Sequence, residues 1–332
     1  MNKRKVTFLS AVLIFITAFS INSGIFARAD EEYFYLGGIP VGFSLQTGGA
    51  TVVGVSDIVT TEGVYSPSKN ADIKVGDVIL SVNGKEVTDS ASIANALKDC
   101  EGNPVEVKIE RDGLFITKYV TPRIDYDGTY KLGLFLRDNL SGIGTLTYIT
   151  SDGKYGSLGH PITDDDGKLL EIKGGTTYLC SIIGVVRGER GKAGELKGIF
   201  IEDRKIGNVT VNNETGVYGE VDKSYDYGKL EKVKVGRASV GKATVYTCAD
   251  GVSPSVYDIS IVKIDDNNAE NKNYVIKIDD KKLLALTGGI LQGMSGSPIV
   301  QSGNVVGAVT HVFINDPTRG YGINIEKMVA NT

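Results

Sequence analysis

"GGILQGMSGSPIV", residues 288–300, is the stretch that decides the fold, because it sets a serine between glycines and then runs into an apolar, strand-like segment. Gly, Ser and Pro at this density are typical of a tight turn, and a turn alone would explain them. A serine raised on such a turn is also how many hydrolases present a nucleophile. Since a serine hydroxyl is a weak nucleophile until a base removes its proton, the histidines decide between the two interpretations.

The base has few candidates, because the chain contains only two histidines, His160 in "YGSLGHPITD" and His311 in "GAVTHVFIND". We predict that His160 is the base of Ser295, since it stands at a glycine-rich strand end well before the serine. The segment that ends in His311 would pair with the backbone of a substrate. We therefore expect Thr310 and His311 to line the substrate pocket.

A carboxylate usually orients the histidine of such a site. Spacing by analogy with chymotrypsin-like proteases would place it near Asp203. The residue pattern alone leaves several candidates open, namely Asp203, Asp222, Asp226, Asp250, Asp258, Asp279 and Asp280.

Residues 293–298, "GMSGSP", resemble the nucleophile loop of chymotrypsin-like proteases, Gly-x-Ser-Gly-Gly/Ser-Pro. In such a loop the backbone N–H groups of Gly293 and Ser295 would stabilise the oxyanion of the reaction. Met294 stands where digestive proteases carry an aspartate that pairs with a freed N-terminus. A methionine cannot form that ion pair, so activation by this route is excluded.

The segment 128–332 has many short runs of Val, Ile, Tyr and Thr between glycines. Regular strands with Gly and Asp turns predict an all-β barrel or sandwich, and "RGYGINI" (319–325) fits a last strand. With the nucleophile loop, this predicts a mainly β, chymotrypsin-like double β-barrel peptidase domain. A small α/β domain would precede it.

That smaller domain is predicted over residues 35–123. The sequence favours a strand at Val78–Val82, a hairpin turn at Asn83-Gly84, a helix over 89–100 and two strands within 104–122. The core "GDVILSVNG" (76–84) resembles PDZ domains of exported proteases. The domain boundaries would therefore be 35–123 for the PDZ domain and 128–332 for the peptidase domain.

PDZ domains bind peptide ends, or internal segments, by adding a strand beside a sheet edge. "PVGF" (40–43) fits the carboxylate-binding loop, in which Val41, Gly42 and Phe43 would offer backbone N–H groups. Ile93 and Leu97 would line the other wall. The alternative is that Gly42 is only a bend. If the loop is there, Gly42→Glu would weaken peptide recognition and spare the barrel.

The whole chain resembles the stage IV sporulation protein B peptidase family. "YGSLGHPITD", the PDZ segment and the long run from "DKKLLALTGG" to "GYGINIEKM" carry the resemblance. It implies a serine endopeptidase with the triad His160, Asp280 and Ser295, where Asp280 belongs to the Asp-x-Lys-Leu-Leu segment. Lys281 stands where some relatives would have proline.

The resemblance also implies a biological role. Family members cleave themselves and then a membrane-bound regulator of an intramembrane protease, which triggers a late mother-cell sigma factor. They are exported across, or anchored in, the forespore inner membrane and face the intermembrane space. The alternative is an exported, catalytically inactive PDZ binding or scaffold protein.

Composition and the N-terminus restrict the remaining classes. A net charge of −4 gives no reason to expect a nucleic-acid partner. Residues 1–29 combine a basic start, an apolar run and an A-x-A exit, which predicts a signal peptide or membrane anchor. The chain has three distant cysteines, no C-x-x-C and no EF-hand pattern, so we expect no cofactor and no metal.

Overall fold

The computed structural model describes residues 33–137, 140–164 and 167–332. The predicted export segment, 1–29, lies outside these residues. None of the helices in the described ranges is long and apolar enough to cross a membrane.

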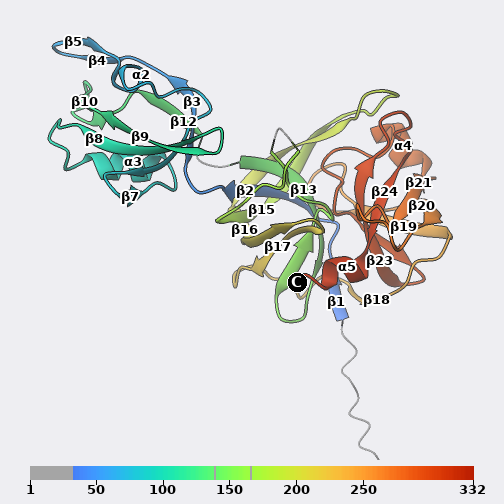
Figure 1. The fold of residues 1–332 in the computed structure, drawn as a ribbon. Coiled ribbons are helices and arrows are strands. Elements are labelled where there is room, and N and C mark those ends of the chain that lie inside the picture. The colour runs from blue at the N-terminus through green and yellow to red at the C-terminus, as the bar shows by residue number, and fades with distance from the viewer. Residues whose placement is uncertain (1–32, 138–139, 165–166) are drawn as a thin grey trace, which may run out of the picture. The chain divides into compact units, whose positions relative to one another are not determined.

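Two closed β-barrels form the peptidase part of the chain (Figure 1). The first barrel closes in the order β14-β17-β16-β15-β2-β13, and the second in the order β23-β22-β19-β20-β21-β24. β1 and β18 pair with each other and join the two barrels. The elements of this part are β1 (Tyr33–Leu36), β2 (Pro40–Gln46), β13 (Leu140–Ile149), β14 (Lys154–Ser157), β15 (Gly174–Val186), β16 (Glu195–Asn213), β17 (Gly216–Val221), β18 (Lys232–Val235), β19 (Gly241–Thr247), β20 (Ser255–Ile264), β21 (Tyr274–Ile278), α4 (Lys281–Thr287), β22 (Pro298–Gln301), β23 (Asn304–Val312), β24 (Arg319–Asn324) and α5 (Ile325–Val329).

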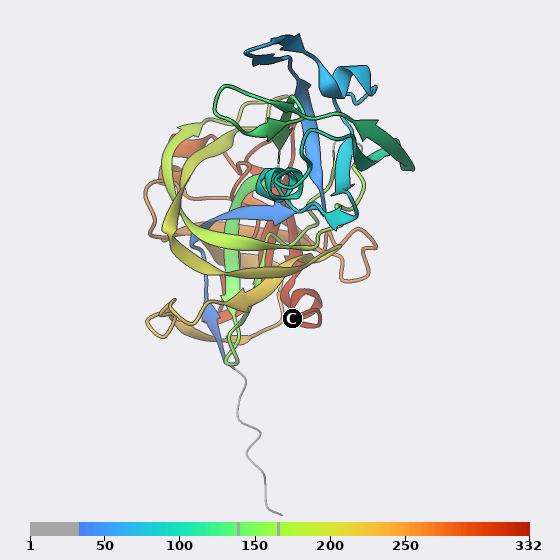
Figure 2. The ribbon, with the colours of Figure 1, turned by 90° about the vertical axis from the view of Figure 1, so that its left-hand side faces the viewer.

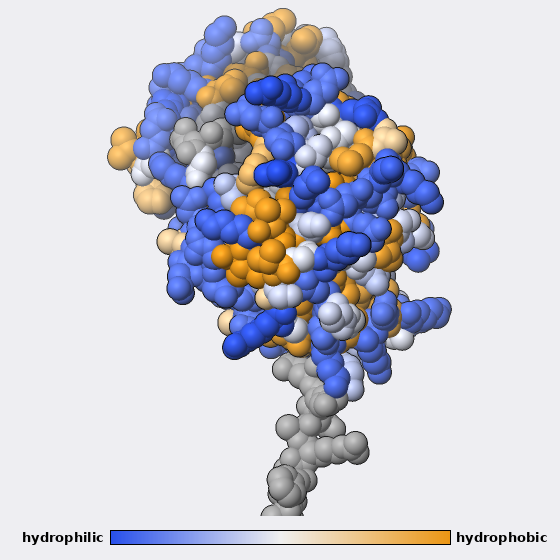
Figure 3. Space-filling model, turned by 90° about the vertical axis from the view of Figure 1, so that its right-hand side faces the viewer, coloured by the Kyte–Doolittle hydropathy of each residue, from blue (hydrophilic) through white to orange (hydrophobic). Residues whose placement is uncertain are grey.

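The expected mainly β, chymotrypsin-like double barrel is therefore confirmed. Alternating strands with one face turned inward produce this architecture. Each barrel encloses its own apolar core, the first around Phe43, Leu146 and Val209 and the second around Ile276, Ile299 and Val309. Figure 3 shows one face of the second barrel, where exposed hydrophobic residues gather among hydrophilic ones. Such exposed apolar side chains are common on folded proteins and do not alter the assignment of the core.

The PDZ unit is a second β-structure with its own core, around Ile79, Leu97 and Ile109. Its main sheet has the order β12-β3-β6-β8-β9, and β7 pairs with β6. The elements are β3 (Ala50–Val55), β4 (Ile58–Thr60), β5 (Gly63–Tyr65), α2 (Pro67–Asn70), β6 (Val78–Val82), β7 (Lys85–Glu86), α3 (Ser90–Leu97), β8 (Val105–Arg111), β9 (Leu114–Val120), β10 (Arg123–Ile124), β11 (Tyr130–Lys131) and β12 (Leu134–Arg137).

The helix cap and the hairpin turn predicted for the PDZ unit are confirmed. The Asp89 side chain caps α3 by accepting from Ser92 N–H at 2.7 Å. Asn83 and Gly84 both have positive φ, +49° and +72°, as the hairpin turn between β6 and β7 requires.

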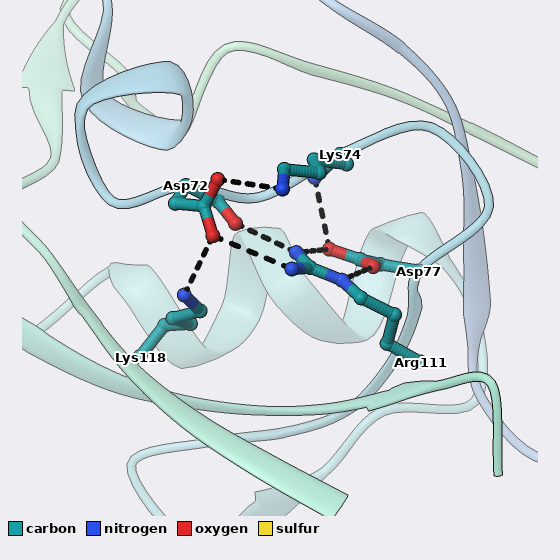
Figure 4. Close-up of polar contacts among 5 residues, drawn as sticks. All are labelled: Asp72, Lys74, Asp77, Arg111 and Lys118. Atoms are coloured by element: carbon teal, nitrogen blue, oxygen red, sulfur yellow. Dashed lines mark hydrogen bonds and ion pairs between the residues drawn. The ribbon is translucent and has the colours of Figure 1, made fainter. Parts of the chain in front are cut away.

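An ion-pair network fixes the turn that leads into β6 (Figure 4). The Arg111 guanidinium donates to both carboxylate oxygens of the buried Asp77, at 2.6 and 2.8 Å. Burial alone would raise the pKa of Asp77, but the bonds from Arg111 and Lys74 N–H outweigh it and lower the pKa. The Asp72 carboxylate forms ion pairs with Arg111, Lys74 and Lys118.

Strand pairing corrects the predicted boundaries of both domains. β1 and β2 belong to the peptidase sheet, although the sequence pattern predicts residues 35–46 as part of the PDZ domain. β12 belongs to the PDZ sheet, although the pattern predicts residues 134–137 as part of the peptidase. The PDZ unit is therefore inserted between β2 and β13, which are adjacent antiparallel strands with Leu45 opposite Leu140 (Figures 1 and 2).

Candidate active site and peptide groove

Ser295 lies on a turn between α4 and β22, and glycines make this turn possible. Gly293 and Gly296 have φ values of +95° and +91°, which side-chain-bearing residues rarely adopt. A Cβ on Gly296 would lie 2.1 Å from Thr145 O of the first barrel. The nucleophile loop therefore fits tightly against β13, as its glycine pattern indicates.

Thr145 holds this loop from the first barrel. Its N–H donates to Ser295 O at 2.9 Å, and its hydroxyl donates to Gly293 O at 2.9 Å. Met294 points the other way, fully buried in the core of the second barrel. A position that carries a charged aspartate in digestive proteases is thus an apolar anchor here.

Backbone donors remain available at the predicted oxyanion hole. Within residues 33–137, 140–164 and 167–332, neither Gly293 N–H nor Ser295 N–H donates to a protein acceptor. Two free N–H groups on one turn are what an oxyanion hole supplies. Their catalytic role stays a prediction.

His160 reaches the site from the first barrel. It follows β14 through Leu158 and Gly159, which have φ values of +66° and +71°. A Cβ on Gly159 would lie 2.9 Å from Ile323 and 3.0 Å from Thr310, so this turn packs directly on the second barrel. His160 and Ser295 thereby come from different barrels to border one cavity.

The ring of His160 is held by its neighbour's carbonyl. Nδ1 lies 2.8 Å from Pro161 O, and because a carbonyl only accepts, the bond places a proton on Nδ1. In the neutral ring, Nε2 then carries the lone pair that a general base needs. Burial lowers the pKa of His160 below its usual 6.5, although the Pro161 carbonyl opposes this.

His311 stacks on His160, with 4.7 Å between the ring centroids and an interplanar angle of 40°. Burial, then His160 and Lys272, lower the pKa of His311 to about 4, against the opposing effect of Glu270. Both imidazoles are therefore held in the neutral form near pH 7. His311 and Thr310 adjoin the site but do not line the cavity that Ser295 borders.

Ser295 is not bonded to His160 in this arrangement. Its hydroxyl donates to Thr310 O at 2.6 Å. The Thr310 hydroxyl itself is buried and has no hydrogen-bond partner among the described residues. A nucleophile held by a backbone carbonyl must rotate before it can give its proton to the histidine.

The predicted third member of the triad does not lie at His160. The Asp280 carboxylate caps α4, accepting from Lys282 N–H at 2.8 Å and Leu283 N–H at 2.9 Å. In the described part of the chain it makes no hydrogen bond or ion pair with His160. The reserve candidate, Asp203, is exposed on β16, and among the described residues it makes no hydrogen bond or ion pair with His160 either. The orienting acceptor of His160 in this structure is Pro161 O.

A cavity of about 410 Å³ is bordered by Ser295 and His160. Its walls are mostly apolar and come largely from the first barrel: Phe43, Leu45, Leu140, Ile143, Leu158 and Ile162. β2 and β13, the strands between which the PDZ unit is inserted, supply four of these side chains. An extended, apolar peptide segment fits such a wall.

The predicted carboxylate-binding loop at Val41, Gly42 and Phe43 is wrong. These residues lie in the middle of β2, where Gly42 is paired on one side with Ile143 and on the other with Tyr178. A Cβ on Gly42 would lie 2.2 Å from the Phe200 ring. Their backbone groups belong to the barrel sheet, so they cannot receive a peptide carboxylate.

The candidate PDZ groove lies elsewhere. A cavity of about 430 Å³ lies between α3 and the segment from Tyr130 to Leu136, and both Ile93 and Leu97 line it. β12 pairs with β3 and forms the edge of the sheet as described. The helix wall of this groove agrees with the expectation for Ile93 and Leu97, whereas the strand wall was not predicted from the sequence.

The candidate carboxylate-binding residues on this wall, not predicted from the sequence, are Leu132, Gly133 and Leu134. Gly133 has a φ of +74°, and a Cβ there would lie 2.4 Å from Ser56 O. The N–H groups of Leu132 and Gly133 donate to no acceptor among the described residues. "KLGLFLR" (131–137) has the same apolar-Gly-apolar pattern as "PVGF", so this signal was present in the sequence.

The described ranges contain no cluster of three or more His, Cys, Asp or Glu that could hold a metal ion. Cys100, Cys180 and Cys248 are buried free thiols. The site as described thus consists of a serine, a neutral histidine pair and free backbone donors.

Comparison with known families gives two matches. A model described as SpoIVB peptidase S55 matches residues 128–329, and a PDZ domain model matches residues 37–117. Among curated proteins, one named as a candidate zinc metalloprotease of Clostridium perfringens is 32% identical over 69 residues, 21% of each chain. A similarly named protein of Thermotoga maritima is 28% identical over 128 residues, 39% of this chain and 24% of that one. The chain spans only about a fifth to a quarter of the length of these relatives.

Two solved structures are similar to parts of this chain. The PDZ domain of an SdrC-like protein from Listeria monocytogenes covers 27% of this chain and 90% of its own, at 17% identity and a TM-score of 0.22. The inactive form of the Rv3671c protease of M. tuberculosis covers 57% of this chain and 83% of its own, at 16% identity and a TM-score of 0.32. At such TM-scores the barrel assignment rests on the strand pairing alone.

Proposed function

The chain belongs to the SpoIVB peptidase S55 family, and from this premise we propose that it is a serine endopeptidase with Ser295 as nucleophile and His160 as general base. One observation carries the proposal. Ser295 and His160 come from different barrels, border one cavity, and lie beside two backbone N–H groups without a described acceptor. A nucleophile, a base and oxyanion donors are the parts that acyl transfer requires.

The reaction begins when Ser295 rotates away from Thr310 O. Its hydroxyl proton passes to Nε2 of His160 as the oxygen attacks the peptide carbonyl. The N–H groups of Gly293 and Ser295 stabilise the negative oxygen of the intermediate. His160 returns the proton to the leaving amine, and water then hydrolyses the acyl-enzyme by the same steps.

The Pro161 carbonyl orients His160 during these steps. A carbonyl dipole stabilises an imidazolium less than a full carboxylate charge does, so this arrangement is a resting form of the site. Asp280 is the third member that the family resemblance implies. Its present contacts assign it to the cap of α4, and the substitutions described in the Discussion test its catalytic role.

The substrates are proteins, and the PDZ groove selects them. Free N–H groups at Leu132 and Gly133 can receive a peptide carboxylate, and the open edge of β12 can receive its strand. From family membership we include self-cleavage and cleavage of a membrane-bound regulator of an intramembrane protease, as part of late sigma-factor signalling in sporulation. From the same premise we propose that the protein acts at the forespore inner membrane and faces the intermembrane space.

The test compares the full chain with Ser295→Ala. We expect a fluorophosphonate to label the parent and not the variant, and new N-termini to arise by self-cleavage in the parent only. The substitution removes one hydrogen bond to a carbonyl, so the free energy of unfolding should fall by about 1 kcal/mol or less. A parent that is neither labelled nor cleaved would favour the alternative, a PDZ scaffold protein without peptidase activity.

A further inference from the structure

The hairpin formed by β15 and β16 reaches from the first barrel to the nucleophile loop. Near its base, β15 pairs with β2 in the first barrel, with Thr177 opposite Phe43. Near its end, Val186 pairs with Glu195. We call residues 187–196 the hairpin tip. Leu196 of this tip lies in the core of the second barrel.

Backbone hydrogen bonds join the hairpin tip to the segment before Ser295. Gln292 N–H donates to Gly194 O at 2.9 Å, and Leu196 N–H donates to Gln292 O at 2.9 Å. Gly188 N–H donates to Thr287 O at 2.9 Å, at the end of α4. The residue directly before Gly293 is therefore bonded on both of its backbone groups.

Side chains of the hairpin tip reinforce these bonds. Leu196 is 5% exposed and lies against Gly293, where a Cβ would come within 3.1 Å of the leucine Cβ. The Arg187 guanidinium donates to the carbonyls of Leu284 and Ala285 in α4. These carbonyls lie at the C-terminal end of a helix, where a positive charge is favourable.

The backbones of the hairpin tip and of the segment after α4 pack so closely that neither can move without the other. A Cβ on Gly288 would lie 2.4 Å from Gly188 O. A Cβ on Gly194 would lie 2.3 Å from Val186 O, so the tip itself is tightly folded. A movement of the hairpin tip would therefore displace the loop that ends in Gly293.

We propose that the hairpin tip is a positioning element for the oxyanion hole, with Arg187 and Leu196 as its positioning residues. In digestive proteases, an aspartate at the position of Met294 pairs with a freed N-terminus and thereby orders the oxyanion-hole loop. Met294 cannot form that ion pair, and the hairpin tip orders the loop in its place. The inference rests on the proposed function, because it concerns how Gly293 N–H is held for the reaction at Ser295.

Positioning has a kinetic signature. Oxyanion donors act on the charge that develops during attack on the carbonyl or phosphoryl group, so their displacement lowers the rate of the chemical step more than it weakens initial binding. A fluorophosphonate reports this directly, since its phosphoryl oxygen occupies the oxyanion hole. The maximal labelling rate should fall, and the concentration giving half of that rate should stay nearly constant.

The experiment uses the full chain with Arg187→Ala, Arg187→Lys and Leu196→Ala. Arg190→Ala is the matched control, because Arg190 lies in the same tip and its side chain makes no hydrogen bond or ion pair among the described residues. We expect the maximal labelling rate to fall about 10-fold or more in Arg187→Ala and Leu196→Ala. Arg187→Lys should recover part of the rate, and Arg190→Ala should match the parent.

Equal labelling rates in the parent, Arg187→Ala and Leu196→Ala would overturn the inference while leaving the peptidase intact. A parent without labelling would remove the proposed function and the inference with it. Leu196 is a core residue, so its variant can fail to fold; in that event Arg187→Ala decides alone, since its side chain is exposed.

Discussion

At the scale of single residues, two backbone carbonyls bind the side chains of Ser295 and His160, so that these do not bond to each other. Ser295 Oγ is bonded to Thr310 O, and His160 Nδ1 to Pro161 O. Each bond costs little to break, about 1 kcal/mol for a neutral pair, so a bound substrate can realign them. The chemistry of the site then depends on His160 staying neutral.

The pH dependence of labelling tests the state of His160. Its pKa lies below 6.5 because burial disfavours the charged ring, so the base should stay competent below the pH at which an ordinary histidine is protonated. We expect the acidic limb of the labelling rate of Ser295 to have its midpoint clearly below pH 6.5. A midpoint at or above that value would contradict the burial of the ring.

The free energy of unfolding should depend on pH through the same two histidines, His160 and His311. Their pKa values are lower in the folded than in the unfolded chain, so the unfolded state binds more protons in acid. The stability they contribute is complete above the unfolded pKa of 6.5 and is lost as pH falls toward about 4. The contribution of His311 should be small, since this residue is exposed. Denaturant unfolding of the parent and His160→Gln across this range would show it as a difference in slope.

At the scale of elements, helix α4 depends on the N-cap residue that precedes it, Asp280. Asp280 accepts two backbone N–H groups at the N-terminus, and a negative charge there also favours the helix dipole. The helix leads into the nucleophile loop at Gly288. The cap therefore supports the site even without contact to His160.

Two substitutions distinguish between two roles of Asp280, as the cap of α4 and as a catalytic carboxylate. We expect Asp280→Ala to lower the free energy of unfolding by about 1 kcal/mol, and Asp280→Asn to recover most of it because asparagine caps well. The labelling rate of Asp280→Asn then tests the role that the family resemblance implies. A rate near that of the parent leaves Asp280 as a cap, whereas a loss of about 10⁴-fold in a stable protein would assign it to the triad.

At the scale of the whole molecule, the chain enters the first barrel before it forms the PDZ unit. β2 and β13 adjoin in the barrel, and the PDZ unit occupies the chain between them. The same two strands line the cavity beside Ser295. A glycine of β2 and a glycine of the PDZ groove should therefore have separable effects.

Gly42→Glu and Gly133→Ala test this division in the full chain. Gly42→Glu should lower stability and labelling of Ser295, since the side chain would collide with the Phe200 ring inside the barrel. This reverses the expectation drawn from the sequence. Gly133→Ala should weaken binding of fluorescent peptides with apolar C-termini about 10-fold or more, because its Cβ meets Ser56 O in a left-handed conformation. Labelling should be unchanged.

Gly113→Ala is the control for the second variant. Gly113 has a similar φ, +75°, but a Cβ there meets nothing within 4 Å. It therefore carries the backbone strain without the collision. Equal peptide binding by Gly133→Ala and the parent would place the carboxylate site away from "KLGLF".

Much of the molecule could be predicted from its sequence because the relevant signals are local. The strand at Val78–Val82, the Asn83-Gly84 turn and the Asp89 cap depend on neighbouring residues and lie where the pattern placed them. The glycines around Ser295 likewise predicted a strained turn with free N–H groups. Local conformational preference and hydrogen bonding within a few residues carry this information.

Only the tertiary structure decided which partners distant segments find. "PVGF" and "KLGLF" have the same apolar-Gly-apolar pattern, and the first became a barrel strand because it pairs with β13 and β15, about 100 residues or more away. For the same reason His160 Nδ1 bonds to Pro161 O and not to the expected Asp280, which caps α4, since the contacts of His160 depend on how the two barrels meet. The sequence by itself determined a glycine-rich serine turn, a double barrel and a PDZ unit; long-range strand pairing decided their boundaries, the walls of the candidate peptide groove and the acceptor that orients His160.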